Sequence, residues 1–237
     1  MQKNRLNILS TRPLNKEIID EAAQQNIFID CISFIETQPI QNSGLKEKIQ
    51  KLSAKKITVV FTSMNAVEAV KNCLSKKPEW GIFSIGQTTK KLIADFFDEE
   101  NIIATANDAS ALADTIIDKK IKEVVFFCGD QRRDELPVKL KAKNINVEEV
   151  IVYSTIATVE KVSKRYDGIL FFSPSGVESF FSANEVDSNT ILFAIGNTTA
   201  ETINQKVHNK IIIAERPGKE ALVKKMLDYF SIQKQVN

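Results

Sequence analysis

Histidine and cysteine are scarce in this sequence. His208 is the one histidine, and the three cysteines, Cys31, Cys73 and Cys128, lie far apart with no CxxC spacing. These residues support neither a zinc site nor a disulfide framework, so we expect buried, reduced thiols and an exposed loop position for His208. Ser175 does not lie in a GxSxG turn, and a Ser-His-acid triad is not supported either.

Several other signatures are missing as well. No GxGxxG or GxxxxGK[S/T] occurs, which argues against dinucleotide and P-loop sites. No apolar run approaches the roughly 18 residues of a membrane span, and the first residues lack the apolar core of a signal peptide. The 32 basic and 30 acidic residues are spread along the whole chain, so nothing favours nucleic acid or a membrane surface. We expect a cytoplasmic protein that binds neither.

The sequence does contain a regular alternation of short apolar segments and longer segments with helical period. Examples are ITVVFTS followed by NAVEAVKNCLSKK, and GILFFSP followed by GVESFFSAN. Most of the predicted strands are apolar on both faces, which is typical of parallel strands covered by helices. The chain has 237 residues, 43% of them hydrophobic, which is enough for two domains. We therefore predict an α/β protein with two doubly wound parallel sheets.

A repeat lies within this pattern. A shift of 110 residues takes Ser63 to Ser173 and Gly86 to Gly196 without a gap, so that residues 59–117 fall on residues 169–227. The remaining segments, 7–37 and 125–155, resemble each other more weakly, and each has the order strand, turn, helix, strand. The chain therefore has the order A-B-A-B. The repeat alone leaves open whether each A packs with the B that follows it.

Serine, threonine and glycine stand where the predicted helices begin, in FTSMNAV and SPSGV and in IGQTTKK and IGNTTAE. A helix start offers unpaired backbone N–H groups and a favourable dipole, so such turns can bind carboxylates. In doubly wound sheets these loops lie at the carboxyl ends of the strands, where ligands bind. The same hydroxyls can instead cap their own helices, and the residues alone do not decide between the two roles.

In this order and spacing, a set of short motifs resembles the uroporphyrinogen-III synthase family over essentially the whole chain: FTSMNAVEAV, SIGQTTKKL, CGDQRRDEL, VEEVIVYST, FFSPSGVESF and FAIGNTTAE. The resemblance implies two similar α/β domains joined by a two-stranded ladder, the second inserted into the first. Residues 1–36 with 155–237 would form the first domain, and residues 38–153 the inserted one. The segments ISFIETQPI and VIVYSTIAT would be the crossing strands, so the pairing would be swapped and neither A would pack with the B that follows it.

The resemblance also implies a function. The family converts hydroxymethylbilane, a linear tetrapyrrole with eight carboxylates, into uroporphyrinogen III, with loss of water and inversion of the last pyrrole ring. Loss of the terminal hydroxyl leaves a reactive cation, so positioning of the flexible chain matters more than strong acids and bases. The implied protein is a cofactor-independent, metal-free lyase of haem and tetrapyrrole biosynthesis. It would act as a monomer, with a transient contact with hydroxymethylbilane synthase.

The same resemblance assigns roles to individual residues. Tyr153, in the VxYxT strand, would donate a proton to the leaving hydroxyl as a positioned weak acid. Substrate carboxylates would bind at Arg12, Ser63, Thr89, Arg132, Ser173, Ser175, Gly176, Thr198 and Thr199. Of the adjacent Arg132 and Arg133, only one is expected to reach the site.

Some of these positions have alternative interpretations. Many family members have an arginine where this chain has Asn65, and Lys90 and Lys91 are candidates to compensate, unless they lie on a solvated helix face. Arg12 could be a surface arginine, and Tyr153 a structural residue of the ladder. Two other functions also remain open: a non-catalytic tetrapyrrole or small-acid binding or sensor module, and a periplasmic-type binding protein with two α/β lobes. The missing signal peptide argues against the periplasmic protein.

Overall fold

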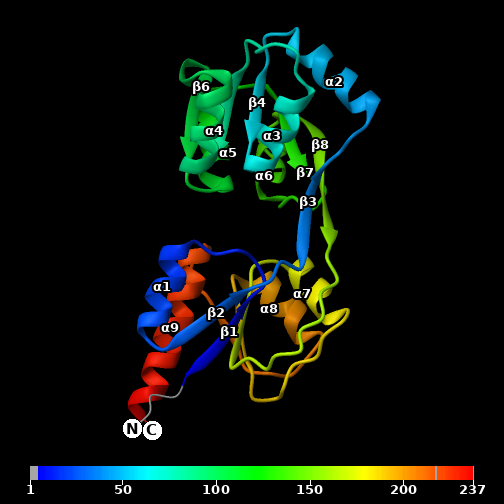
Figure 1. Ribbon diagram of the computed structural model, residues 1–237. Helices are drawn as coiled ribbons and strands as arrows, with labels where there is room; N and C mark the ends of the chain where they lie inside the picture. Colours follow the sequence, from blue (N-terminus) through cyan, green and yellow to red (C-terminus); the bar gives the residue numbers. More distant parts are fainter. Residues whose placement is uncertain (1–4, 217, 237) are drawn as a thin grey trace. The chain divides into compact units, whose positions relative to one another are not determined.

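The computed structural model describes residues 5–216 and 218–236 (Figure 1). Contacts divide the chain into two compact units. Unit 1 comprises Met1–Glu36 and Ile156–Asn237, and unit 2 comprises Thr37–Thr155. Each contains one sheet covered by helices, and each is described in turn.

Unit 1 is built on a five-stranded sheet with the order β11-β10-β9-β1-β2, in which all neighbouring strands are parallel. Its strands are β1 (Leu6–Ser10), β2 (Ile27–Cys31), β9 (Gly168–Phe171), β10 (Ile191–Ala194) and β11 (Ile211–Ile213). Its helices are α1 (Lys16–Gln24), α7 (Pro174–Phe181), α8 (Asn197–Asn204) and α9 (Lys219–Val236). Helices α1 and α9 lie on one face of the sheet (Figure 1) and α7 and α8 on the other. Their apolar side chains pack against these faces in two separate clusters.

Unit 2 has a six-stranded sheet with the order β3-β8-β7-β4-β5-β6. The strands are β3 (Ile35–Pro39), β4 (Thr58–Phe61), β5 (Gly81–Ile85), β6 (Ile102–Ala106), β7 (Glu123–Gly129) and β8 (Asn146–Ala157). The helical segments are α2 (Ser43–Ser53), α3 (Met64–Cys73), α4 (Gln87–Phe97), the 3-10 turn η1 (Glu99–Asn101), α5 (Ala109–Asp118) and α6 (Glu135–Lys141). The strands from β8 to β6 are parallel. The α/β class with parallel sheets is confirmed.

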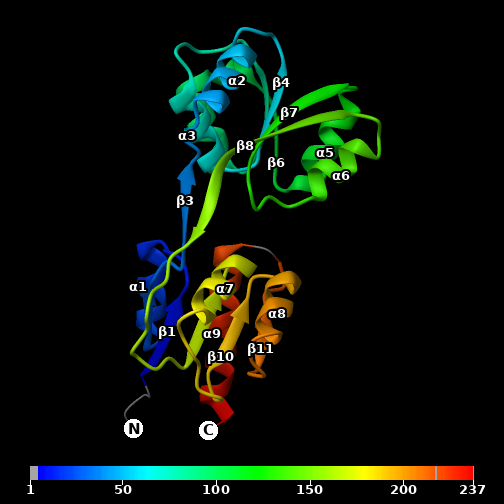
Figure 2. The same ribbon diagram turned by 90° about the vertical axis from the view of Figure 1, so that its right-hand side faces the viewer.

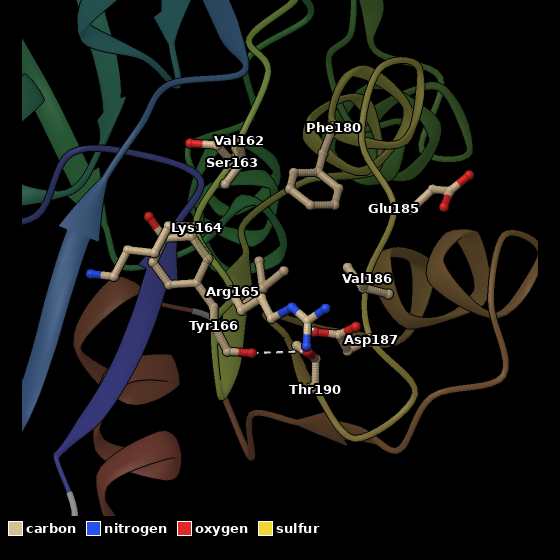
Figure 3. A pocket seen from close by; sticks show the side chains of 11 residues that line it. Val162, Ser163, Lys164, Arg165, Tyr166, Phe180, Glu185, Val186, Asp187 and Thr190 are labelled. Atoms are coloured by element: carbon tan, nitrogen blue, oxygen red, sulfur yellow. Dashed lines mark hydrogen bonds and ion pairs between the residues drawn. The ribbon is translucent and has the colours of Figure 1, made fainter.

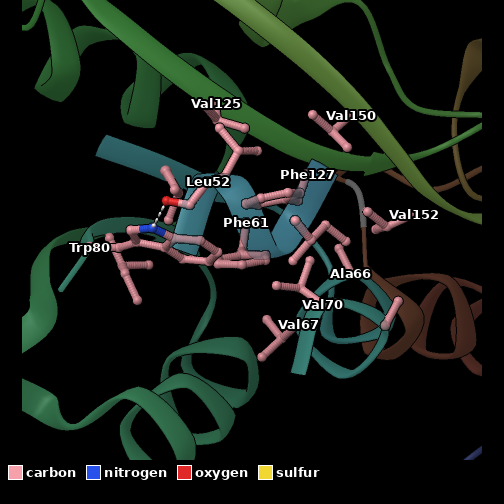
Figure 4. Close-up of a cluster of buried hydrophobic side chains, with 14 of the residues drawn as sticks. Leu52, Phe61, Ala66, Val67, Val70, Trp80, Val125, Phe127, Val150 and Val152 are labelled. Atoms are coloured by element: carbon pink, nitrogen blue, oxygen red, sulfur yellow. Dashed lines mark hydrogen bonds between the residues drawn. The ribbon is translucent and has the colours of Figure 1, made fainter. Parts of the chain in front are cut away.

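An aromatic cluster forms the core between the unit 2 sheet and the helices α2, α3 and α4 (Figure 4). Phe127 stacks on Phe61 at a centroid distance of 5.4 Å and on Trp80 at 5.5 Å. The indole N–H of Trp80 donates to the backbone oxygen of Leu52 (3.2 Å). All these rings are almost completely buried, so this core holds α2 and α3 firmly on the sheet.

The chain passes between the units twice, along β3 and β8 (Figure 2). At one end of this pair the backbone N–H of Ile40 donates to the oxygen of Val152 (3.0 Å), and at the other end the N–H of Thr158 donates to the oxygen of Phe34 (2.9 Å). Residue numbers rise along one strand as they fall along the other, so β3 and β8 form an antiparallel two-stranded ladder.

The predicted repeat is confirmed in the positions of the elements. The strands β4 and β9 are 110 residues apart at both ends, and so are the first residues of α3 and α7, of α4 and α8, and of α5 and α9. In the sheets, β1 pairs with β9 and β7 pairs with β4. The first A segment therefore packs with the second B, and the second A packs with the first B, so neither packs with the B that follows it.

The cysteines only partly match the expectation. All three are free thiols, but Cys31 is exposed, Cys73 is partly buried and Cys128 is fully buried. The prediction of a buried thiol is wrong for Cys31, because it is the last residue of β2, the strand at the edge of its sheet. His208 is exposed between α8 and β11, as predicted. Within the described ranges, no helix is both long and apolar enough to cross a membrane.

Candidate carboxylate-binding sites

The helix starts lie along the carboxyl edge of each parallel sheet. In unit 1 the chain moves outward in one direction from β9 to β11, and in the other from β1 to β2. In unit 2 it moves from β4 to β6 and from β7 to β8 in the same way. Each sheet therefore has a switch point, between β1 and β9 or between β7 and β4, and ligands of such sheets bind beside it. The predicted serine turns follow β9 and β4.

The turn before α7 is a capped helix start. The hydroxyl of Ser173 accepts a hydrogen bond from the N–H of Gly176 (3.1 Å) and lies 3.1 Å from the hydroxyl of Ser175. Pro174 occupies the first helical position, where no N–H is needed. Ser173 thus has the capping role, and the N–H of Ser175 has no partner among the described residues. This N–H remains available to an anion.

Gly176 is required for space rather than for backbone conformation. It has no positive φ, but a Cβ atom there would lie 3.3 Å from the hydroxyl oxygen of Ser173. In unit 2 the equivalent turn places Ser63 before α3, where its hydroxyl accepts from the N–H of Asn65 (3.1 Å). Asn65, which replaces the family's frequent arginine, is half-buried. Both predicted serines therefore shape their helix starts.

Each of the two threonine turns contains one exposed and one buried threonine. At the start of α8, Thr198 is exposed and Thr199 is 3% exposed; at the start of α4, Thr88 is exposed and Thr89 is 7% exposed. Gly86, which precedes α4, has φ of 76°, a conformation that favours glycine. The sequence singled out Thr89, whereas Thr88 is the accessible hydroxyl in unit 2. The 110-residue shift, which aligns Thr88 with Thr198, could have identified it.

Arg12 follows β1 in a loop that is fixed on both sides. The hydroxyl of Ser10 donates to the backbone oxygen of Arg12 (2.6 Å), and both the N–H and the hydroxyl of Thr11 donate to the oxygen of Leu170 (3.1 and 2.8 Å). Ser10 and Thr11 are fully buried, while Arg12 is half-buried. No carboxylate of the described residues pairs with Arg12. An arginine on a fixed loop, whose guanidinium has no acidic partner, suits a ligand carboxylate.

Arg132, in contrast, already has acidic partners. Its guanidinium donates to the carboxylates of Glu149 and Asp134. Glu149 also accepts from Lys141 (2.8 Å). Burial acts to raise the pKa of Glu149, but the hydrogen bonds from Lys141 and Arg132 outweigh it and lower the pKa. Arg133 is exposed and makes no ion pair with a described residue.

The two lysines after IGQTT differ in the same way. Lys90 forms an ion pair with Glu99 (3.3 Å). Lys91 is exposed, and no described carboxylate pairs with it. Of this pair, Lys91 has the freer charge.

Tyr153 lies on β8 directly over Gly129 of β7. A Cβ atom on Gly129 would lie 2.4 Å from Cε2 and 2.8 Å from the hydroxyl oxygen of Tyr153. The register of the two strands shifts at this point, and the N–H of Asp130 donates to the backbone oxygen of Tyr153 (3.1 Å). The ring packs against the aromatic core, and its hydroxyl has no partner among the described residues. The absence of a side chain at Gly129 therefore sets the position of this hydroxyl.

Two cavities among the described residues lie elsewhere. One, of about 220 Å³, lies among the residues that precede β9 and β10, including Tyr166, Arg165 and Asp187 (Figure 3). Another, of about 170 Å³, lies where β4, β7 and β8 begin. Both are at the amino ends of the strands, opposite to the helix starts, so neither is the candidate site. In the described part of the chain, no group of three or more His, Cys, Asp or Glu side chains could hold a metal ion.

The fold and these turns define an α/β protein with two repeat-related parallel sheets, each with serine and threonine residues at the helix starts along its carboxyl edge. A family model described as uroporphyrinogen-III synthase HemD matches residues 17–224. The chain belongs to the uroporphyrinogen-III synthase family.

Individual relatives agree with this assignment. Uroporphyrinogen-III synthase of Saccharomyces cerevisiae is 29% identical over an alignment of 148 residues that covers 50% of this chain and 52% of the yeast protein, so the match spans about half of that relative. The crystal structure of uroporphyrinogen-III synthetase from Helicobacter pylori has 16% identity and a TM-score of 0.66, covering 94% of this chain and 99% of that one. A mutant Thermus thermophilus uroporphyrinogen III synthase has 10% identity and a TM-score of 0.61, covering 97% and 99%. These two structures share the fold.

Proposed function

We propose that this protein is a uroporphyrinogen-III synthase, which closes hydroxymethylbilane to uroporphyrinogen III with inversion of the last pyrrole ring and loss of water. The observation that carries the proposal is the family match over residues 17–224. The helix starts support it, because a substrate with eight carboxylates needs many anion-binding groups, and backbone N–H groups at helix starts provide them without titratable side chains.

The carboxylate contacts follow from the exposed groups at the two sheet edges. In unit 1 these are the free N–H of Ser175, the hydroxyl of Thr198 and the guanidinium of Arg12. The capping of Ser173 and Ser63 keeps the helix starts in shape, and Gly176 leaves room beside the first of them. Thr89 and Thr199 support the starts from their buried side. Arg132 contributes only if it exchanges an acidic partner for the substrate, whereas Arg133 is free to bind.

Tyr153 is the proposed proton donor. The C–O bond of the hydroxymethyl group breaks, the hydroxyl leaves as water with the phenol proton, and a delocalised cation remains on the substrate. The substituted carbon of the last ring then attacks this cation, the bond from that carbon to its original methylene breaks, and this methylene rejoins the ring at its free α carbon, which inverts the ring. The proton that the ring system finally releases returns to the tyrosinate, so the enzyme is unchanged. Tyr153→Phe keeps the ring over Gly129 and removes only the hydroxyl, so kcat should fall by about tenfold, less than the 10²–10⁴ of a stronger acid. A full rate would exclude this role.

Several finer statements belong to the same proposal. Unit 1 and unit 2 would be the two domains of the family, with boundaries near 36 and 155. The enzyme would act as a monomer in the cytoplasm and use no cofactor. A transient contact with hydroxymethylbilane synthase would limit the loss of substrate, because free hydroxymethylbilane closes spontaneously to the type I isomer.

A coupled assay tests the function. Hydroxymethylbilane synthase supplies the substrate, the products are oxidised to uroporphyrins, and the type I and type III isomers are separated by chromatography. The same reaction without this protein gives the spontaneous type I background. We expect mainly type III product in its presence. Type I product alone would overturn the proposal, and affinity for the substrate without type III product would indicate a non-catalytic binding protein.

A further inference from the structure

Two cations from distant parts of the sequence meet at the carboxyl edge of unit 1. Arg12 follows β1, and Lys219, 207 positions later, is the first residue of α9. The ammonium group of Lys219 donates to the backbone oxygen of Pro13 (3.2 Å), the residue next to Arg12. The position of Lys219 is fixed from the other side as well, because Leu222 and Met226 of α9 are fully buried against the sheet.

Nearby acids offset the charge of this pair only in part. Among the described residues, neither Arg12 nor Lys219 forms an ion pair. Glu220 follows Lys219 in the sequence but is exposed and makes no ion pair with it. Burial lowers the pKa of Lys219, and the nearby charge of Arg12 lowers it further, while Glu220 and Cys31 act to raise it. The two cations therefore repel each other in the free protein, and a bound anion would relieve the repulsion.

The repeat in unit 2 has no cation at the corresponding places: Asp130 stands at the position of Arg12, and the neutral Ala109, next to Asp108, at the position of Lys219. There α5 begins with Ala109 in place of Lys219, and Asp108 caps the helix by accepting from the N–H of Ala111 (2.8 Å). The loop after β7 carries Asp130, which accepts from the N–H of Thr155 (2.9 Å). These acids stabilise the backbone. A lysine at a helix start is unfavourable with respect to the helix dipole, so the cations of unit 1 oppose stability where unit 2 has stabilising acids.

We propose that Lys219 and Arg12 together bind one carboxylate of the substrate, Arg12 by its planar fork and Lys219 by its ammonium group. The inference rests on the proposed function and adds Lys219 as a binding residue.

The test compares Lys219→Met and Lys219→Arg with Lys224→Met in the full chain. Lys224 is an exposed lysine of the same helix without an ion pair to a described residue, so its variant removes the same charge away from Arg12. Two measurements are made: KM and kcat with hydroxymethylbilane, and the dissociation constant for uroporphyrin III, the oxidised product with eight carboxylates, by equilibrium dialysis. The melting temperature of each variant is recorded as well.

For Lys219→Met we expect KM and the dissociation constant to rise by about tenfold, the order of one charge-assisted hydrogen bond. Its kcat should stay within about twofold, and its product should stay type III. Lys219→Arg should bind nearly as the unaltered protein does, and Lys224→Met should be unchanged. Lys219→Met should also be at least as stable as the unaltered protein, because the substitution relieves a repulsion. If Lys219 were merely structural, its removal would lower the melting temperature.

Equal KM and equal uroporphyrin affinity in Lys219→Met and Lys224→Met would overturn the inference. So would weaker binding that is accompanied by a lower melting temperature and is not restored in Lys219→Arg. Failure of the proposed function would give a different result, because the unaltered protein itself would then form only type I product. The dialysis measurement would then still decide whether the pair binds a polycarboxylate.

Discussion

Replacing Gly129 with alanine tests the contact that positions the Tyr153 hydroxyl. The new methyl carbon would lie 2.4 Å from Cε2 and 2.5 Å from Cζ of the ring. The ring has to move by at least about 0.6 Å to restore the shortest distance found for real Cβ atoms, about 3.0 Å. It cannot retreat into the core, because it packs on the aromatic cluster of unit 2.

The size of the effect follows from these contacts. Overpacking of this kind costs about 1–3 kcal/mol, and the lower entropy of the unfolded chain with alanine returns about 0.4–1 kcal/mol. We expect unit 2 to lose about 1–2 kcal/mol of its free energy of unfolding. Because the ring must swing outward, the hydroxyl is displaced as well, and kcat should fall at least as far as in Tyr153→Phe.

The assay is urea unfolding, monitored by tryptophan fluorescence. Trp80 is the one tryptophan of the chain and lies in the same core as the Tyr153 ring, so the signal reports on unit 2. A double-mutant cycle isolates the contact. In a Tyr153→Ala background, Gly129→Ala should not lower the free energy of unfolding. In a Tyr153→Phe background it should lower it as much as in the unaltered protein, because the ring carbons remain. An equal cost in the Tyr153→Ala background would refute the reasoning.

Three further predictions concern the serine turn and the thiols. Ser175→Ala leaves the hydrogen bond between Ser173 and Gly176 intact, so the free energy of unfolding and KM should barely change. Gly176→Val crowds the Ser173 hydroxyl, which lies 3.3 Å from the Cβ position, so it should cost about 1–2 kcal/mol of stability and raise KM. Equal effects of the two variants in unfolding and kinetic measurements would contradict this. Thiol labelling of the folded protein should modify Cys31 and spare Cys128. Burial raises the pKa of Cys128 from 9.0 to about 11, so its stabilising contribution is complete below pH 9 and is lost between pH 9 and 11. Urea unfolding across that range should show unit 2 losing up to about 2–3 kcal/mol, and a loss of the same size in Cys128→Ala would contradict the assignment.

The fold could be predicted from the sequence to the extent that its signals are local. Apolar runs and helical periods mark each strand and helix, and the 110-residue shift places the helix starts in register. The choice of partner strand is not local. Pairing of β1 with β9 depends on contacts about 160 positions apart, so only the resemblance to a family indicated it.

The sites were predictable to the same limited degree. The capping turns at Ser63 and Ser173 are visible as residue types before a helix. The partner of Arg132 is not, because Glu149 lies on the neighbouring strand 17 positions later, and nothing in the spacing shows that the charge is neutralised. Lys219 was missed for the same reason, since its nearness to Arg12 arises only when the last helix packs on the first strand's sheet.

The pairing of β1 with β9 also determines when the sheet of unit 1 can form during synthesis. β2 ends at residue 31, and the strand that completes the middle of its sheet begins at residue 168. At about 5–20 residues per second, β1 and β2 wait on the order of 7 to 30 seconds for β9 to leave the ribosome. Unit 2 is continuous in the chain and is fully synthesised within that interval. The first strands made are therefore among the last to find their sheet.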